Sequence, residues 1–278
     1  MAESVYAIHD STYHPRRWAG SPWSASMQHG GPVIGLFARE TERVADDLDM
    51  RLARLTVDLF KAVPLAPLVA ETRVIRQGRR VAALESILHP RDDGSPVCRA
   101  SSLLLRATPS SGPVWESPEA PPPPFDASRP ATHPGSGATT LPPGFHERVE
   151  IRPGLDEAGP FVWMTTSLDL VADEPISPLQ RAAMLTDMTL GIQMRMARER
   201  ARVAPGDPRS TLGSLMINTD TTIYLERPVV GGHLAMRPTL LAQRNGIGTA
   251  EVILYDADGR VGRSLQSALT QRHFAATD

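Results

Sequence analysis

The sequence predicts an α+β fold of two tandem units, each with a long helix wrapped by an antiparallel β-sheet. The main observation is an internal repeat, because segments of the second half match segments of the first half in the same order. Pro64 and Pro228 are 164 residues apart, and so are Val97 and Val261. In both halves one helical pattern comes before four strand-like patterns. Together these observations indicate that an α+β unit was duplicated within one chain.

The first unit is expected to span residues 1–107. Apolar residues at helical spacing predict a helix from Pro32 to Leu48, and proline suits the first position of a helix. Alternating patterns then predict four strands, with turn signals around Gly78 and Gly94. The expected strands are 53–63, 69–76, 80–89 and 96–106.

Residues 108–144 are rich in proline and show little periodicity, which predicts a linker between the units or an excursion that follows the protein surface. The second unit, residues 145–278, is expected to open with a strand near 161–169. Ser177 as a hydroxyl N-cap and Pro178 at the first helical position then predict one helix through Arg200. Strands follow at 214–227, 233–244, 248–256 and 260–271, with a hairpin turn at Asp258-Gly259. A long helix inside a curled antiparallel sheet is the hotdog arrangement, so the two units form a double hotdog.

Composition excludes several classes of protein. The 278 residues are 41% hydrophobic and 22% charged, which is typical of a soluble globular protein. A formal net charge of -2 provides no attraction for nucleic acid, so we expect no nucleic-acid partner. The chain shows neither a signal-peptide pattern nor an apolar run long enough to span a membrane, which favours a cytoplasmic location. Its one cysteine, Cys98, lies in a strand pattern and is expected in the core.

Several kinds of chemistry have no matching motif in this chain. It contains no Gly-x-Ser-x-Gly elbow and no phosphate-binding loop of the Walker type. The eight histidines do not show the spacing of zinc ligands. We therefore expect neither a metal nor another cofactor.

Asp187 is the first candidate for a catalytic group. Helical spacing places it on the same face as Ala183, Leu190 and Met194, which the apolar pattern assigns to the interior. Burying a charge is costly unless another group pairs with it or uses it. Two interpretations remain open from this pattern: a general base, or a carboxylate at the edge of the apolar stripe that bonds to nearby backbone.

Gly30 and Gly31 begin the helix of the first unit, directly after His29. Backbone N–H groups at a helix start can approach a ligand closely when no side chain intervenes, and the helix dipole favours negative charge there. This arrangement predicts an oxyanion hole, with His29 also in the substrate-binding region. The alternative is a glycine turn that only lets the chain enter the helix.

The two helices differ in a way that predicts one site rather than two. Eight residues beyond Gly30 the first helix has Ala38, which has no acid or base function, whereas the second helix has Asp187 but no glycine pair at its start. Two amides on strands, Asn218 and Gln266, could complete the site, although an ordinary cross-strand hydrogen bond is the simpler explanation for each residue taken alone. We expect a single pocket between the units.

Five segments stand out when the whole chain is considered: QHGGPVIGLFARE, LTVDLFKAVP, MLTDMTLGI, INTDTTIYLERP and VGRSLQSALTQR. Together they resemble the acyl-CoA thioesterase II group, whose members are double hotdogs. The mechanism of that group uses an Asp, a hydroxyl and a Gln to hold the attacking water. The resemblance assigns these roles to Asp187, Asn218 and Gln266, and Asn218 departs from the usual hydroxyl residue, with Thr219 beside it.

The resemblance implies hydrolysis of acyl-CoA thioesters in lipid metabolism, with Asp187 as general base and the Gly30 and Gly31 amides polarising the carbonyl. Two alternatives remain. One is a hotdog hydratase or dehydratase, for which we would expect a His and Asp pair on one helix, and the sequence shows no such pair. The other is a non-catalytic protein that binds acyl thioesters. Exposed sheet edges are also compatible with a homo-oligomer.

Overall fold

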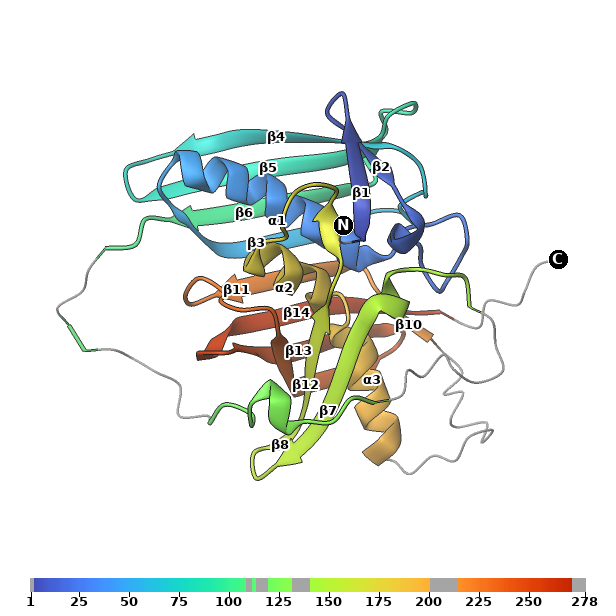
Figure 1. The fold of residues 1–278 in the computed structure, drawn as a ribbon, viewed down its shortest axis with the longest axis vertical. Helices are drawn as coiled ribbons and strands as arrows, with labels where there is room; N and C mark the ends of the chain where they lie inside the picture. Colours follow the sequence, from blue (N-terminus) through green and yellow to red (C-terminus); the bar gives the residue numbers. More distant parts are fainter. Residues whose placement is uncertain (1–2, 109–111, 114–119, 132–140, 201–214, 272–278) are drawn as a thin grey trace.

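The computed structural model describes residues 3–108, 112–113, 120–131, 141–200 and 215–271. Within them, fourteen strands form one continuous sheet that curls around three α-helices (Figure 1). The first unit contains β1 (Ser4–His9), β2 (Thr12–Pro15), α1 (Gly30–Asp47), β3 (Arg51–Leu59), β4 (Leu68–Gln77), β5 (Val81–Pro90) and β6 (Cys98–Leu105). The second contains β7 (Val149–Asp156), β8 (Gly159–Thr166), β9 (Asp169–Val171), α2 (Pro178–Thr186), α3 (Thr189–Arg200), β10 (Leu215–Asn218), β11 (Asp220–Leu225), β12 (Leu234–Arg244), β13 (Ile247–Asp256) and β14 (Gly259–Gln271).

The order of strands is symmetrical about the centre of the sheet. There β11 of the second unit pairs antiparallel with β3 of the first, and Asp220 lies opposite Asp58. Outward from this pair the order is β14, β13, β12, β8, β7 on one side and β6, β5, β4, β2, β1 on the other. Each of these strands therefore has a counterpart across a pseudo-twofold axis, whereas β9, which pairs parallel with β1 at one edge, has none on this path.

A shared irregularity supports the duplication. The register of β4 shifts between Val74 and Arg76, and the register of β12 shifts between Pro238 and Leu240, 164 residues later. A β-bulge is a local insertion that is unlikely to arise twice at equivalent positions by chance. The double hotdog prediction is confirmed, and the predicted core position of Cys98 agrees with its complete burial.

Strands β1, β2, β7 and β9 were not predicted. Each unit begins with a hairpin, β1–β2 or β7–β8, whose inner strand extends the sheet next to β4 or β12. The turn of the first hairpin is made by Asp10 and Ser11, with φ values of 48° and 61°. Turns of this kind usually contain glycine, so the sequence lacks the signal that identifies a tight hairpin. β9 is only three residues long. The strand predicted at 214–227 is divided by Thr219 into β10 and β11.

Part of the proline-rich segment packs on the second unit. Trp163 donates an indole hydrogen bond to the carbonyl of Pro123 (2.8 Å). The ring of Phe125 stacks on His233 with 3.7 Å between centroids, and the Arg152 guanidinium lies 3.8 Å from its centroid on the other side. Residues 120–131 therefore cover an apolar patch on the outer face of the second sheet, in addition to connecting the units.

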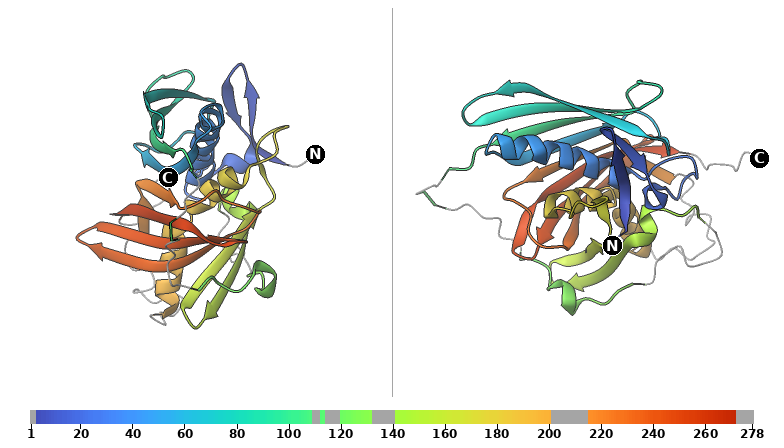
Figure 2. Two further views of the ribbon diagram at one scale, coloured as in Figure 1. Left: turned by 90° about the vertical axis from the view of Figure 1, so that its left-hand side faces the viewer. Right: turned by 45° about the horizontal axis from the view of Figure 1, so that its top comes forward.

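The helices α1 and α2 lie side by side between the two halves of the sheet (Figures 1 and 2). Glycines in α1 permit this contact. A Cβ atom on Gly31 would lie 2.5 Å from the main-chain oxygen of Met184, and one on Gly35 would lie 2.6 Å from the Met184 side chain. The close approach brings the start of α1 next to the end of α2. Among the described residues no helix is long and apolar enough to span a membrane.

A pair of glycine substitutions tests this contact. Gly31→Ala should destabilise the protein by about 1–3 kcal/mol, because the new methyl group meets main-chain atoms of α2 that cannot rotate away. Gly191→Ala in α3 is the matched control, since no atom lies within 4 Å of its added Cβ. That change should be neutral or stabilising by up to about 1 kcal/mol. Urea unfolding of both variants provides the measurement, and equal effects would contradict the proposed packing.

Candidate active site

Asp187 lies at the junction of the two units, in the break between α2 and α3, and its carboxylate faces the start of α1. His29 Nδ1 is 2.9 Å from Asp187 Oδ2, and the two side chains are each 8% exposed. Asn218 Nδ2 donates to Asp187 Oδ1 at 2.8 Å. Burial acts to raise the pKa of Asp187, but the hydrogen bond and charge of His29, with the Asn218 amide and the Gly31 N–H, outweigh it and lower this pKa. The carboxylate is therefore ionised at neutral pH.

His29 is the N-cap of α1, and its Nδ1 atom also lies 3.1 Å from the Gly31 nitrogen. The two contacts of Nδ1 require different protonation states, because an unprotonated nitrogen accepts from Gly31 whereas a protonated one donates to Asp187. We favour the tautomer that carries its proton on Nδ1, since a lone pair on this atom, 2.9 Å from a carboxylate oxygen, would be repelled. The Gly31 N–H then donates to Asp187 as well, and His29 Nε2 points away from the carboxylate.

Gly30 lets the carboxylate reach the helix start. A Cβ atom on this residue would lie 2.6 Å from Asp187 Oδ1, so any other side chain would displace the acid. The positive end of the α1 dipole then stabilises the carboxylate. Within the described chain the Gly30 N–H donates no hydrogen bond, whereas the Gly31 N–H faces Asp187 and His29. Of the two amides expected to bind a carbonyl oxygen, only that of Gly30 is free to do so here.

Gln266 in β14 produces the break in the helix. Its Oε1 atom accepts the Leu190 N–H at 2.9 Å, and its Nε2 atom donates to the Thr186 carbonyl at 3.3 Å. In a continuous helix the Leu190 N–H would bond to the Thr186 carbonyl, four residues earlier. The Gln266 amide takes the place of that bond, which is a known cause of a helix kink. The expected single helix is therefore two helices, with Asp187 between them.

Thr221 is a site residue that the sequence analysis missed. Its hydroxyl accepts a hydrogen bond of 2.8 Å from Gln266 Nε2 and is fully buried. It fixes the orientation of the amide that interrupts the helix. Thr219, which the sequence placed beside Asn218, is exposed instead and directs its hydroxyl to the Ser267 carbonyl. The signal for Thr221 was its position three residues after Asn218 in a run of threonines.

The structure thus brings together all six candidate residues, but in roles that differ in part from the expectation. Asp187, His29, Gly30, Gly31 and Asn218 form one hydrogen-bonded group. Gln266 lies beneath it, 1% exposed, with both ends of its amide bonded to protein atoms. The His and Asp pair that was sought on one helix is also present, contributed by two helices of different units. In the described part of the chain no three His, Cys, Asp or Glu side chains converge as a metal site would require.

Solved structures similar to this chain share its fold over nearly the whole length. Acyl-CoA thioesterase II TesB2 from Mycobacterium marinum is 15% identical, with a TM-score of 0.63, covering 98% of this chain and 96% of its own. A candidate thioesterase II from Thermobifida fusca YX is 19% identical, with a TM-score of 0.66 and the same coverage. A hot dog protein of unknown function from Alicyclobacillus acidocaldarius is 16% identical, with a TM-score of 0.63 and 96% coverage of both chains.

Comparison of sequences gives the family. No curated protein matches the chain significantly. The model of the acyl-CoA thioesterase N-terminal domain matches residues 19–105, and the model of the C-terminal domain matches residues 118–270. The two matches fall on the two units of the fold and together include every residue of the site. The chain therefore belongs to the acyl-CoA thioesterase family.

Proposed function

We propose that the protein hydrolyses acyl-CoA thioesters to a free acid and CoA at the site around Asp187. The observation that supports this most directly is an ionised, buried carboxylate next to a free backbone N–H at a helix start. The carboxylate can accept a proton from water, and the N–H can stabilise the oxyanion that forms on the thioester carbonyl. The two groups come from different units, so the fold has to be complete before the site exists.

The proposed reaction begins when the thioester carbonyl oxygen accepts the Gly30 N–H. A water hydrogen-bonded to Asp187 and Asn218 attacks the carbonyl carbon, and Asp187 takes the proton of this water. The C–S bond then breaks, and the proton passes from Asp187 to the departing sulfur. Because hydrogen bonds lower the pKa of Asp187, its carboxylate is a weak base. Its contribution to the rate therefore depends on its correct placement and burial next to the water. His29 holds the carboxylate in orientation through Nδ1.

Gln266 is proposed as a positioning residue, and we do not assign it to direct contact with the water. Its amide is fully engaged by Leu190, Thr186 and Thr221. Without it the main-chain groups of Thr186 and Leu190 lose these partners, and the break that directs Asp187 towards Gly30 is no longer held. This role differs from the water-holding role that the resemblance implies.

A second candidate function is hydration or dehydration of the acyl chain of a thioester. The His29–Asp187 pair favours it, because a carboxylate bound to Nδ1 leaves Nε2 as a base that could remove a proton from carbon. The two functions are separated by supplying 2-enoyl-CoA and 3-hydroxyacyl-CoA substrates. A hydratase would change the ultraviolet absorbance of the conjugated enoyl thioester without releasing a thiol, whereas the proposed hydrolase would release CoA.

Substitution of the base is the first test. Asp187→Asn should lower thiol release by about 10²- to 10⁴-fold, the range typical of losing general-base assistance. Asn218→Thr, which introduces the hydroxyl usual in the resembled group, should retain or raise turnover. Thermal melts establish that both variants fold. If the Asp187→Asn protein released thiol at the wild-type rate, the proposed role of the carboxylate would be wrong.

The pH dependence gives a second test. Asn218 donates to the carboxylate and so helps to lower the pKa of Asp187. In Asn218→Ala this pKa should rise towards that of an ordinary carboxyl group. Because the base must be ionised to act, the acid limb of kcat/KM should move to higher pH in the variant. An unchanged or lower acid limb would show that Asp187 is not the titrating group.

The positioning role of Gln266 gives a third test. Gln266→Leu keeps the volume of the side chain but leaves buried main-chain groups of Thr186 and Leu190 without their present partner, which should destabilise the protein by about 1–3 kcal/mol. Turnover should fall while KM changes little, since the acid moves but the substrate surface stays. Faster hydrogen exchange at the Leu190 amide would accompany the change. A stable variant with normal turnover would exclude this role.

A further inference from the structure

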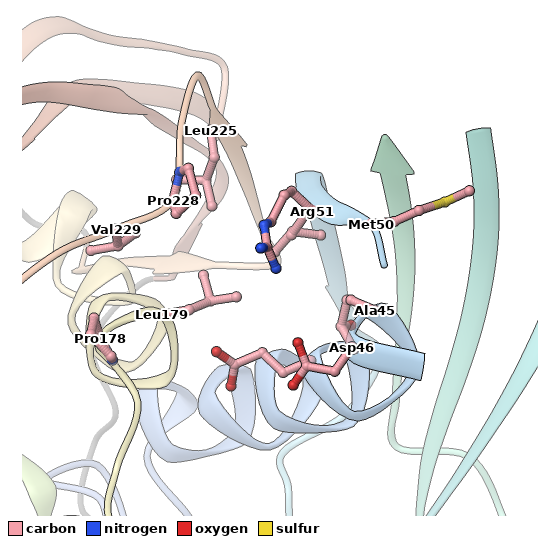
Figure 3. Close-up of a pocket in the computed structure, with 12 residues that line it drawn as sticks. Ala45, Asp46, Met50, Arg51, Pro178, Leu179, Leu225, Pro228 and Val229 are labelled. Carbon is pink, nitrogen blue, oxygen red and sulfur yellow. The ribbon is translucent and has the colours of Figure 1, made fainter. Parts of the chain in front are cut away.

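A cavity lies at the opposite end of the α1–α2 pair from Asp187. Its volume is about 230 Å³, and α1, α2, the start of β3 and the segment after β11 surround it (Figure 3). Pockets that enclose a whole drug-sized ligand measure roughly 300–1,000 Å³. A cavity of this size therefore suits only part of a ligand, such as a short acyl chain.

The cavity is the pseudo-twofold counterpart of the active site. The helix α1 begins beside Asp187 and its last turns line the cavity, whereas α2 begins at the cavity and ends beside Asp187. The strands follow the same rule. At the end of β3, the Leu59 N–H bonds to Thr219, the neighbour of Asn218, while β3 starts at the cavity with Arg51. The helices α1 and α2 are thus antiparallel, and both the helix pair and β3 run from the active site to the cavity.

The chemistry at this end differs from that of the active site. Ser177 caps α2 by accepting the Gln180 N–H at 3.0 Å, and its hydroxyl donates to Glu42 at 2.7 Å. Pro178, the first residue of α2, has no N–H. The start of α2 has Pro178 and the bulky Leu179 where the start of α1 has Gly30 and Gly31, and the carboxylate of Glu42 is engaged by Ser177 and Gln180. These features allow binding but not the proposed hydrolysis.

The lining has an apolar side and a charged side, which carries Arg51 and the carboxylates of Glu42 and Asp46. Leu179, Leu225 and Val229 form the apolar side, and Arg51 faces them across the cavity (Figure 3). Arg51 is exposed and forms no ion pair with any described residue. Asp46 is the one exposed carboxylate in the lining.

More arginines follow outward from the mouth of the cavity. Arg51 lies opposite Leu105 in the β3–β6 ladder, and the next residue, Arg106, donates its N–H to the carbonyl of Arg80. Arg80 belongs to the turn between β4 and β5, which also contains Arg79 and follows Arg76. These three arginines are exposed and, within the described chain, are paired with no carboxylate. Arg106 is itself paired with Asp49, so Arg51, Arg76, Arg79 and Arg80 provide the unpaired cations along the ends of these strands.

We propose that this cavity is a second, non-hydrolytic binding site for acyl-CoA, with the acyl chain against Leu179 and Leu225 and the phosphates on the arginines. The apolar side removes the acyl chain from water, and guanidinium groups bind phosphate by paired hydrogen bonds. The choice of acyl-CoA as ligand rests on the proposed function, whereas the cavity and its charges do not. A bound molecule here would contact both units at the end of the α1–α2 pair away from Asp187.

The stoichiometry of binding tests the proposal. The probe is S-hexyl-CoA, a thioether that cannot be hydrolysed, titrated calorimetrically into the full-length protein. Wild type should bind two molecules per chain. Leu179→Trp, which fills the cavity, and Arg51→Glu, which reverses its charge, should each bind one, with kcat/KM at low substrate within twofold of wild type. Arg91→Glu makes the same charge reversal at the other end of β5 and should still bind two.

Two further measurements identify the ligand class. S-hexyl-pantetheine lacks the nucleotide and its phosphates, so it should bind to the second site at least tenfold more weakly than S-hexyl-CoA.

The second measurement changes the protein. Asp46→Asn removes a negative charge, which has the same sign as the charge of S-hexyl-CoA. The variant should therefore bind this probe about two- to fivefold more tightly, the range expected for one exposed charge. Weaker binding in this variant would indicate a cationic ligand and overturn the proposal.

The outcomes separate this proposal from the proposed function. One molecule bound per wild-type chain, with no change in Arg51→Glu, would exclude the second site even if thiol release is rapid. Two bound molecules without hydrolysis of any acyl-CoA would support the second site while refuting the hydrolase. Thermal melts identify any loss of folding in Leu179→Trp, and the surface change Arg51→Glu keeps the test decisive in that case.

Discussion

The amide of Gln266 replaces one hydrogen bond of a helix, and the arrangement around Asp187 depends on this replacement. With the bond between Leu190 and Thr186 interrupted, the chain turns at Asp187 and directs its carboxylate towards the start of α1. A buried carboxylate is costly to keep charged, and here its cost is offset by the helix dipole, His29 and Asn218. A structural amide on one strand thus determines where the charged group of the second unit lies.

The parts of the fold that the sequence predicted are those with a repeated or periodic signal. Four strands and one helix recur in each half, and a constant separation along the chain made the duplication visible. The pairing of Asp187 with Gly30 was also predictable, because the acid had no counterpart in the first helix and the glycines had none in the second. When each of two copies of a unit lacks a functional group that the other copy has, the two copies together are expected to form one site.

The features that the sequence did not predict depend on contacts distant in the chain. Nothing in the residues around Asp187 breaks the helix, since the group that breaks it is 79 residues away in β14. The hairpin β1–β2 turns through Asp10 and Ser11 without glycine. The proline-rich pattern around Phe125 allows a segment that lies along the surface, but it does not identify Arg152 and His233 as the partners of this ring. For the helix break and the Phe125 ring, residues distant in the chain determine the local structure, and the local sequence pattern does not identify those residues.

The central β3–β11 ladder has a consequence for how such a protein can change. In an assembly of two identical hotdog subunits, every substitution appears at both symmetry-related positions, so an improvement at one is also imposed on the other. Here the two strands that meet at the centre belong to one polypeptide and have different sequences, and Asp58 faces Asp220 only once. Each end of the helix pair can therefore acquire mutations independently. Fusion of the two units allows their sequences to differ, while the backbone pairing of the symmetric arrangement is kept.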